Sequence, residues 1–520
     1  MLEGHDWAGP DGALPVPGPA FTWADASRPR TLRRVWLDTF DWRLYRAGLA
    51  LEQVTSHART DITLTGRGGT LIAAEQVGAR QPGQAAAAKP KWPARLDALP
   101  PGPLREHLGP VVGVRALAPV AKAVSVLRER PVLNSDDKTV ARVIVERMSV
   151  SYPSSATPPA RITVTALRGY EPQALRLADA LSAAPGIADA TQSALEAVLA
   201  AAGRRPADYS SKIDVELAAE MPATAALAAV LTALLDTLEA NVDGTVRDLD
   251  IEFLHDLRIA VRRTRSALKL AGSVLPAGLA GTYRPEFKWL GDLTTPTRDL
   301  DVYLLGFPGM AATLVAGTPA DLEPFHDHLA RKRAAAQRQL ARGLRSARFS
   351  RLSAGWRDAL AAAAPGRRRP TAAHLAAGKI AHAHQRVLRA GAGITAASPP
   401  ECLHDLRKRC KELRYLLEIF GSLYEPGEQW RAVRELKGLQ DCLGEFQDTQ
   451  VQYDKIRAYA AELMAGRAAP AATLLAMGEI AAGLMLRQQQ ARNEFGGRFR
   501  DFASPLGQSR IRALTAPAKP

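Results

Sequence analysis

Histidine, arginine and lysine recur at helical spacing in two segments of the chain, and clustered groups of this kind can bind anions. The first segment, LHDLRIAVRRTRSALKL, covers 254–270, and the second, LHDLRKRCKELRYLLEI, covers 403–419. Their leading residues, His255 and His404, are 149 positions apart. The same offset also aligns the positions up to Val302 and Val451. A repeat that stays in register over this length indicates a duplicated structural unit.

The spacing places the cations on one face of each predicted helix. At about 100° per residue, the first segment carries His255, Arg258, Arg262, Arg265 and Lys269 on one arc. The second places His404, Arg407, Lys411 and Arg414 together. Leucines and other apolar residues form the neighbouring stripe, so each helix is predicted to have a packed seam with a basic ridge beside it. A duplicated ridge of this kind points to a polyanion as the ligand.

The alternative interpretation is a solvated helix face. Like charges at this spacing destabilise a helix by about 0.2–0.5 kcal/mol per pair, and Asp256, Asp299 and Asp301 are candidates to offset that cost. One such ridge would not separate the two interpretations. Two ridges in register, each led by a histidine, favour the binding role.

Composition agrees with an anionic partner. The chain of 520 residues has a formal net charge of +15, and residues 251–400 hold 23 Lys and Arg against 10 Asp and Glu. A basic field of this kind attracts polyanions. The three cysteines, Cys402, Cys410 and Cys442, form no CxxC pair, which argues against a disulfide framework and against a zinc site. No cofactor or metal is expected.

The chain is predicted to change character near residue 210, from α+β to all-α. The expected strands before that point are Arg34–Asp38, Gly48–Val54, Asp61–Thr65, Thr70–Glu75, Val124–Arg128, Thr139–Val150 and Arg161–Thr165. Hairpin turns are expected at Gly66–Gly69 and Asn134–Lys138, a loop at Pro82–Leu99, and helices at Gln173–Ala184 and Thr191–Ala202. From Met221 onward the 3.6-residue period predicts helices, with breaks at Gly306–Gly309, Pro365–Pro370, Ala392–Pro400 and Ala465–Pro470.

These patterns give a domain plan. It consists of an extension (1–30), an α+β domain (31–205), a linker (206–221), a helical domain (222–505, with repeats 222–370 and 371–505) and a tail (506–520). The N-terminal sequence lacks a basic segment followed by an apolar one, and the chain has no run of 18 apolar residues. A soluble cytoplasmic protein of unknown oligomeric state is therefore expected.

The helical half resembles a CHAD domain (conserved histidine α-helical domain) over roughly Pro222 to Ser504. The matching motifs are HDLRxxxRRxR at His255–Arg265, RDLDV at Arg298–Val302 and HDLRKRxKxLRY at His404–Tyr415. The resemblance implies two pseudo-symmetric four-helix bundles whose basic residues bind inorganic polyphosphate. It also implies an association with polyphosphate granules.

The motifs and their neighbours nominate the polyphosphate-binding residues. They are His255, Arg258, Arg262, Arg263, Arg265, Lys269, Lys288, Arg298, His384, His404, Arg407, Lys408, Lys411, Arg414, Tyr415 and Lys437. The second copy departs from the first at two positions, with Gln447 in place of Arg298 and Glu418 in place of Lys269. The second half is therefore expected to bind less tightly.

The N-terminal half is similar to a CYTH domain, a β-tunnel that hydrolyses triphosphates with bound metal. The similarity rests on Trp36–Glu52, Asn134–Val150 and Ile162–Leu181. Catalysis in that family implies an ExExK strand whose carboxylates hold Mg²⁺ or Mn²⁺. Residues 1–31 contain acidic residues without the alternation of a strand, and the late strand reads Thr163-Val-Thr165. A degenerate and inactive tunnel is expected, in which bases such as Arg34, Arg43 and Arg46 serve chiefly at the surface.

Three functions remain open on the sequence. The leading one is non-enzymatic binding of polyphosphate by the helical half. The second is a metal-dependent triphosphatase or polyphosphatase in which the helical half captures substrate. The third is non-specific binding of nucleic acid, for which the ridges lack interleaved aromatic residues apart from Tyr415.

Overall fold

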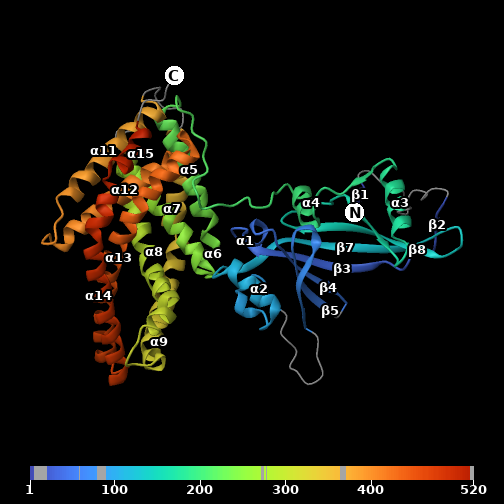
Figure 1. Cartoon of the computed structure of the whole chain (residues 1–520), viewed down its shortest axis with the longest axis horizontal. Coiled ribbons are helices and arrows are strands. Elements are labelled where there is room, and N and C mark those ends of the chain that lie inside the picture. The colour runs from blue at the N-terminus through green and yellow to red at the C-terminus, as the bar shows by residue number, and fades with distance from the viewer. Residues whose placement is uncertain are drawn as a thin grey trace. The chain divides into compact units, whose positions relative to one another are not determined.

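In a computed structural model, the chain forms two compact units, Met1–Ser210 and Ser211–Pro520 (Figure 1). The structure describes residues 1–4, 20–57, 59–78, 90–270, 274–276, 278–363 and 370–515. The division between the units lies inside the predicted linker 206–221.

The first unit is built on an antiparallel sheet. Within its described residues the sheet has ten strands in the order β10-β1-β9-β8-β7-β3-β4-β5-β6, with β2 paired to β7. The strands are β1 (Leu2–Gly4), β2 (Thr22–Trp23), β3 (Arg30–Thr39), β4 (Ala50–Ser56), β5 (Arg59–Thr65), β6 (Leu71–Val77), β7 (Leu117–Leu133), β8 (Thr139–Tyr152), β9 (Ala160–Ala166) and β10 (Ile187–Asp189). All seven predicted strands are confirmed. The three that were missed have only two or three residues, too few to show alternation.

Short helices complete this unit. They are α1 (Arg43–Arg46), α2 (Pro103–Val112), α3 (Glu171–Ser182) and α4 (Ala194–Ala201), with single 3₁₀ turns η1 (Arg67–Gly69) and η2 (Leu96–Ala98). The two predicted helices are confirmed as α3 and α4, whereas α1 and α2 were not predicted. Of the predicted loop Pro82–Leu99, residues 82–89 lie outside the described residues and the rest contains η2.

The hairpin between β7 and β8 shows how local chemistry fixes the register of the sheet. Asn134 Oδ1 accepts hydrogen bonds from the backbone N–H groups of Asp136 and Lys138, both at 3.0 Å. Asp137 takes a left-handed φ of 57°, a conformation that Asp tolerates better than most residues. The predicted turn at Asn134–Lys138 is therefore confirmed.

The second unit is helical. Its helices are α5 (Ala223–Ala240), α6 (Val242–Val246), α7 (Ile251–Leu270), α8 (Leu279–Ala311), α9 (Glu323–Leu344), α10 (Ala347–Ala363), α11 (Ala372–Ala392), α12 (Pro400–Ile419), α13 (Pro426–Ala465), α14 (Ala471–Phe502) and α15 (Pro505–Ala513), with 3₁₀ turns η3 (Pro319–Leu322) and η4 (Gly421–Leu423). The all-helical prediction for this part of the chain is confirmed.

The predicted helix breaks have mixed outcomes. Those at Ala392–Pro400 and Ala465–Pro470 are confirmed, and the one at Pro365–Pro370 lies mostly outside the described residues. The break at Gly306–Gly309 is wrong, because α8 continues through it to Ala311. Phe307 is buried there, 5.9 Å from the ring of Phe325 on α9. The helix continues here although each glycine costs roughly 1 kcal/mol and Pro308 roughly 3 kcal/mol in a helix interior.

Two hydrophobic clusters hold the described part of this unit together. The larger contains residues of α5, α7, α10, α11, α12 and α13, and the smaller joins parts of α8, α9, α13 and α14. Each cluster mixes helices from 222–370 and from 371–505. The cores therefore do not separate into one bundle per repeat, and the two pseudo-symmetric bundles implied by the resemblance are not shown.

The most apolar helical stretch lies in the larger core. Among the described residues, 223–246 form the one helical stretch long and apolar enough to be a candidate membrane span. Its mean hydropathy is 1.5, and 56% of it is buried inside the structure. It is not a run of 18 apolar residues, because Thr232, Asp236 and Glu239 interrupt it. Leu227, Leu231, Leu234 and Leu238 are all at most 3% exposed, as expected of a core helix.

Candidate anion-binding site

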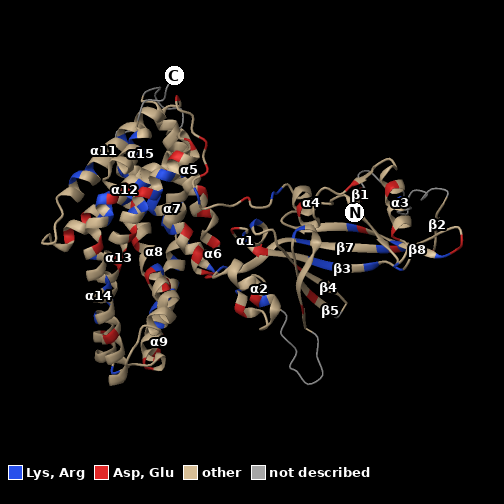
Figure 2. Ribbon diagram, in the orientation of Figure 1, with Lys and Arg blue, Asp and Glu red and all other residues tan. Residues whose placement is uncertain are grey.

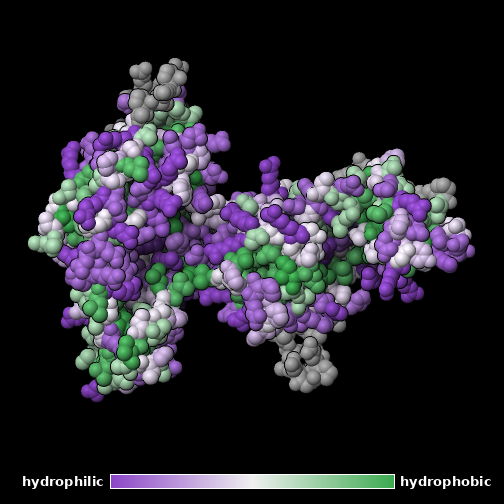
Figure 3. All heavy atoms as spheres, viewed as in Figure 1, coloured by the Kyte–Doolittle hydropathy of each residue, from purple (hydrophilic) through white to green (hydrophobic). Residues whose placement is uncertain are grey.

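The two basic ridges meet in one pocket of the helical unit. Helices α7 and α12 are in contact, and Figure 2 shows Lys and Arg gathered where they lie side by side. The pocket has a volume of about 450 Å³. It is lined by Ile259, Arg262, Arg263, Arg407, Lys411, Arg414, Tyr415, Glu418, Gln440, Asp441, Gly444, Glu445 and Asp448. Figure 3 shows that hydrophilic residues cover this face around α12.

Two of the five pocket cations have no ion pair among the described residues. They are Arg262 of α7 and Lys411 of α12. The guanidinium carbon of Arg262 lies 5.5 Å from the ring centroid of Tyr415, a cation–π contact that leaves its N–H groups available. Burial, and then the charges of Arg407 and Arg262, lower the pKa of Lys411 to about 8. An anion placed between Arg262 and Lys411 would relieve this repulsion.

The other three pocket cations are paired with carboxylates. Glu418 accepts from Arg263 at 2.9 Å and from Arg414 at 2.7 Å, so one carboxylate joins two arginines. Arg407 donates to Asp448 at 2.9 Å. The lining also contains Asp441 and Glu445, so its formal charge is only slightly positive. The pocket therefore has two uncompensated cations, Arg262 and Lys411, beside three that carboxylates compensate.

Three first-copy residues, Arg258, His255 and Arg298, lie outside the pocket lining. Arg258 donates to Thr295 Oγ1 at 2.5 Å, to Thr294 Oγ1 at 3.2 Å and to the carbonyl of Gly291 at 3.3 Å. Burial, and then the charge of Arg298, lower the pKa of His255. Arg298 itself donates to the carbonyl of Ile251 at 3.4 Å.

The second histidine has a different neighbour. His404 Nδ1 lies 2.7 Å from the amide oxygen of Gln447, the residue that replaces Arg298. Where the first copy has the cation Arg298, the second copy thus has Gln447, a neutral residue that hydrogen-bonds to His404. The structure also places three pocket cations on the second copy and two on the first, so it gives no reason to rank the second copy as the weaker one.

The remaining nominated residues do not line the pocket. Lys288, Lys408 and Lys437 are exposed and pair with an Asp on their own helix at 2.7 to 3.2 Å. Lys269 is 70% exposed and lies 3.9 Å from Glu412 of α12. Arg265 is exposed beside Gly291 of α8.

His384 is a core residue. It is 4% exposed, and its ring packs edge-on against Phe502 with centroids 5.7 Å apart. Burial, and then the charge of Arg512, lower its pKa to about 4. A neutral, enclosed imidazole of this kind does not face the pocket.

The sequence analysis missed the acidic lining supplied by α13. Asp441, Glu445 and Asp448 follow the i, i+4, i+7 pattern of one helix face, which was a readable signal. The sequence alone did not show that this face of α13 lines the same pocket as α12.

The first unit has charged residues on the sheet that are paired with one another. Arg34 donates to Glu146 at 2.6 Å and to Glu52 at 2.9 Å, and Arg161 donates to Glu3 at 2.9 Å. Burial would lower the pKa of Arg34, but Glu52 and Glu146 outweigh it and the pKa lies above its ordinary value. Glu3 lies in β1, a strand that was not predicted, but with three residues and one carboxylate this strand has no alternating ExExK pattern.

These carboxylates do not fit the metal site that the CYTH resemblance implies. Each already accepts from an arginine, and the described residues contain no group of three His, Cys, Asp or Glu placed to hold a metal ion. A hard divalent cation would have to compete with those arginines for its oxygen ligands.

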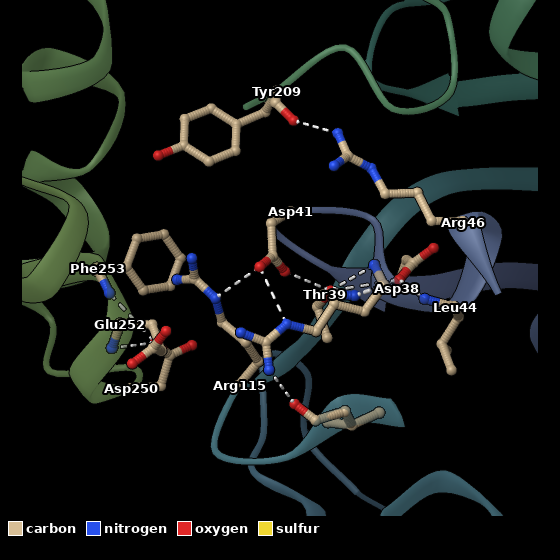
Figure 4. A network of polar contacts seen from close by, with 12 residues as sticks. Asp38, Thr39, Asp41, Leu44, Arg46, Arg115, Tyr209, Asp250, Glu252 and Phe253 are labelled. Carbon is tan, nitrogen blue, oxygen red and sulfur yellow. Dashed lines mark hydrogen bonds and ion pairs between the residues drawn. The ribbon is translucent and has the colours of Figure 1, made fainter. Parts of the chain in front are cut away.

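Other bases of this unit have structural partners near α1 (Figure 4). Asp38 accepts from the backbone N–H groups of Leu44 and Tyr45, each at 2.9 Å, and burial raises its pKa to about 6. Arg43 donates to Asp41 at 3.0 Å, and Arg46 donates to the carbonyl of Tyr209 at 2.8 Å. Arg43 and Arg46 thus hold the fold locally.

Comparison with known proteins identifies the helical part. The family model of the CHAD domain matches residues 229–457. A crystal structure of the CHAD domain from the plant Ricinus communis is similar at 23% identity and a TM-score of 0.43, covering 60% of this chain and 97% of that one. PptA from Streptomyces chartreusis is similar at 19% identity and a TM-score of 0.42, covering 54% and 99%. No curated protein matches the chain significantly.

Proposed function

Because residues 229–457 form a CHAD domain, we propose that this chain binds inorganic polyphosphate without hydrolysing it, through the pocket between α7 and α12. The observation that carries the proposal is the convergence of five cations from both repeats in one pocket, two of them without an ion pair among the described residues. Polyphosphate is the class of ligand that the family resemblance implies.

Guanidinium groups suit this ligand. Their planar N–H donors form charge-assisted, often bidentate bonds to phosphate oxygens. Binding would place phosphates against Arg262 and Lys411, because no carboxylate of the described chain is paired with these two cations. The pocket volume of about 450 Å³ is typical of sites for small ligands, about 300–1,000 Å³. The pocket therefore takes a short stretch of the polymer.

Charge reversal at the two unpaired pocket cations tests the proposal. We expect Arg262→Glu and Lys411→Glu each to weaken binding of labelled long-chain polyphosphate by about ten-fold or more, because charge-assisted hydrogen bonds are lost and a repulsive charge is added. Arg338→Glu is the matched control: Arg338 is exposed on α9, outside the pocket lining. Circular dichroism verifies that the helices remain folded.

Competition at fixed ionic strength tests the ligand class. Unlabelled polyphosphate should displace the labelled polymer at lower phosphate concentration than DNA, RNA or ATP. If DNA or RNA competes equally well, non-specific nucleic-acid binding is the better assignment. If Arg338→Glu weakens binding as much as the pocket variants, the pocket is not the site.

A further inference from the structure

Arg407, one of the pocket cations, is paired with an exposed carboxylate, that of Asp448. Arg407 donates from one nitrogen to both oxygens of Asp448, at 2.9 and 3.2 Å. The arginine side chain is 17% exposed, whereas that of Asp448 is 61% exposed. Asp448 can therefore turn into water at little desolvation cost, and Arg407 would remain in place facing the pocket.

The other carboxylate at the pocket cations differs in this respect. Glu418 is 17% exposed and bonds arginines from two helices, Arg263 of α7 and Arg414 of α12. Releasing it would leave two cations unpaired at the contact between those helices. We therefore expect Glu418 to stay in place while a ligand binds.

The first repeat does not contain the same arrangement. Asp299 is the equivalent of Asp448 by the 149-residue offset, but it pairs with Lys455 of α13 at 2.6 Å. Arg258, the equivalent of Arg407, donates to α8 instead. The exposed carboxylate on a pocket arginine is thus particular to the second repeat.

We infer that Asp448 is a built-in competitor for the anion: it occupies Arg407 in the free protein and is displaced when a polyanion binds. The inference rests on the proposed function. It makes Asp448 a residue that sets the affinity threshold, because a ligand gains Arg407 only if it replaces a carboxylate. A condensed phosphate, with neighbouring negative groups on one chain, can hold Arg262 and Lys411 and still reach Arg407.

Titration calorimetry with inorganic polyphosphate of defined length tests this inference. Asp448→Asn keeps the shape of the side chain and removes its charge, and we expect about two- to five-fold tighter binding, the range that a partly exposed ion pair is worth. Asp441→Asn is the matched control. Asp441 lines the same pocket at similar exposure, but its partner, Lys437, lies outside the lining, so only a smaller long-range gain is expected.

The same substitution in a chain that lacks Arg407 separates competition for Arg407 from a general loss of negative charge near the pocket. In an Arg407→Gln chain, the gain from Asp448→Asn should shrink to that of Asp441→Asn, because the competitor has lost its target. A gain that stays larger than the control's in the Arg407→Gln chain, or a gain in the otherwise wild-type chain that is no larger than the control's, would overturn the inference while leaving polyphosphate binding intact. Failure of the wild-type chain to bind polyphosphate would instead overturn the proposed function and this inference with it.

Discussion

Lys411 is the residue whose chemistry is most altered by its position. It lies half-buried beside Arg407 and Arg262, and burial together with these charges lowers its pKa to about 8. Near neutral pH most Lys411 side chains are still protonated, but burial and the neighbouring arginines make the protonated form less stable than it is in water. A bound polyanion offsets that destabilisation and favours the protonated form.

Binding should therefore weaken as the solution becomes alkaline. Anion binding raises the pKa of Lys411, so it takes up a proton whenever the free lysine is deprotonated. Affinity should be constant below about pH 7 and fall as the pH rises through about 8. Measured from pH 6.5 to 9.5, the dissociation constant of the wild type should rise over that range.

Lys411→Arg provides the comparison for the pH profile. Arginine stays protonated throughout this range, so the variant should bind polyphosphate with a nearly flat profile. The internal phosphates of the polymer remain ionised and contribute no slope. An identical decline in wild type and variant would show that another group titrates.

At the scale of elements, the crossing of α7 and α12 positions the site. Their apolar stripes are buried as predicted: Leu257 and Val261 on α7, and Leu406 and Leu413 on α12, are at most 1% exposed. Glu418 ties the two helices through Arg263 and Arg414. What looked in the sequence like the loss of a cation is a contact between the repeats.

Glu418→Gln should destabilise the helical unit. Removing the charge leaves two half-buried arginines without their shared partner, which costs about 1–3 kcal/mol. Urea unfolding followed by helix circular dichroism should show a lower midpoint. Glu428→Gln is the control: Glu428 is exposed at the start of α13, and its change should stay within about 0.5 kcal/mol of wild type. Equal midpoints for the two variants would contradict the role assigned to Glu418.

Helical phase made part of the site predictable. It placed Arg262, Lys411 and Arg414 on ridges beside buried seams, because that relation depends only on spacing within one helix. It did not reveal that Arg258 turns toward α8 or that Asp448 reaches Arg407, since both depend on how separate helices pack. The same limit applies to Glu3, whose partner Arg161 is 158 residues away in the sequence.

At the scale of the whole molecule, the two units treat their charges differently. The sheet unit pairs Arg34 and Arg161 internally with three glutamates. The helical unit leaves Arg262 and Lys411 without ion pairs among the described residues. Among the described cations of the pocket, Arg262 and Lys411 are therefore the two whose charge no carboxylate of the chain pairs.

The first consequence concerns catalysis. Incubated with Mg²⁺ or Mn²⁺, the chain should release no phosphate from tripolyphosphate above background, because the sheet carboxylates are committed to arginines and phosphoryl transfer needs a held metal. Malachite-green detection of phosphate measures this. Metal-dependent release that disappears on Glu52→Gln or Glu146→Gln would show that the sheet unit is an enzyme.

The second consequence concerns salt. Binding of a phosphate polymer releases counterions, and the logarithm of the association constant falls by about 0.7 per neutralised single-strand phosphate for each unit in the logarithm of salt concentration. If only Arg262, Lys411 and the exchanged Arg407 take part, the slope should be about −1.4 to −2.1. If all twelve nominated Lys and Arg residues took part, it would be near −8. Polyphosphate titrations at NaCl concentrations from about 50 to about 300 mM measure this slope. The slope distinguishes binding in the pocket from binding along a diffuse basic surface. A slope near the larger value would place polyphosphate along the whole helical face.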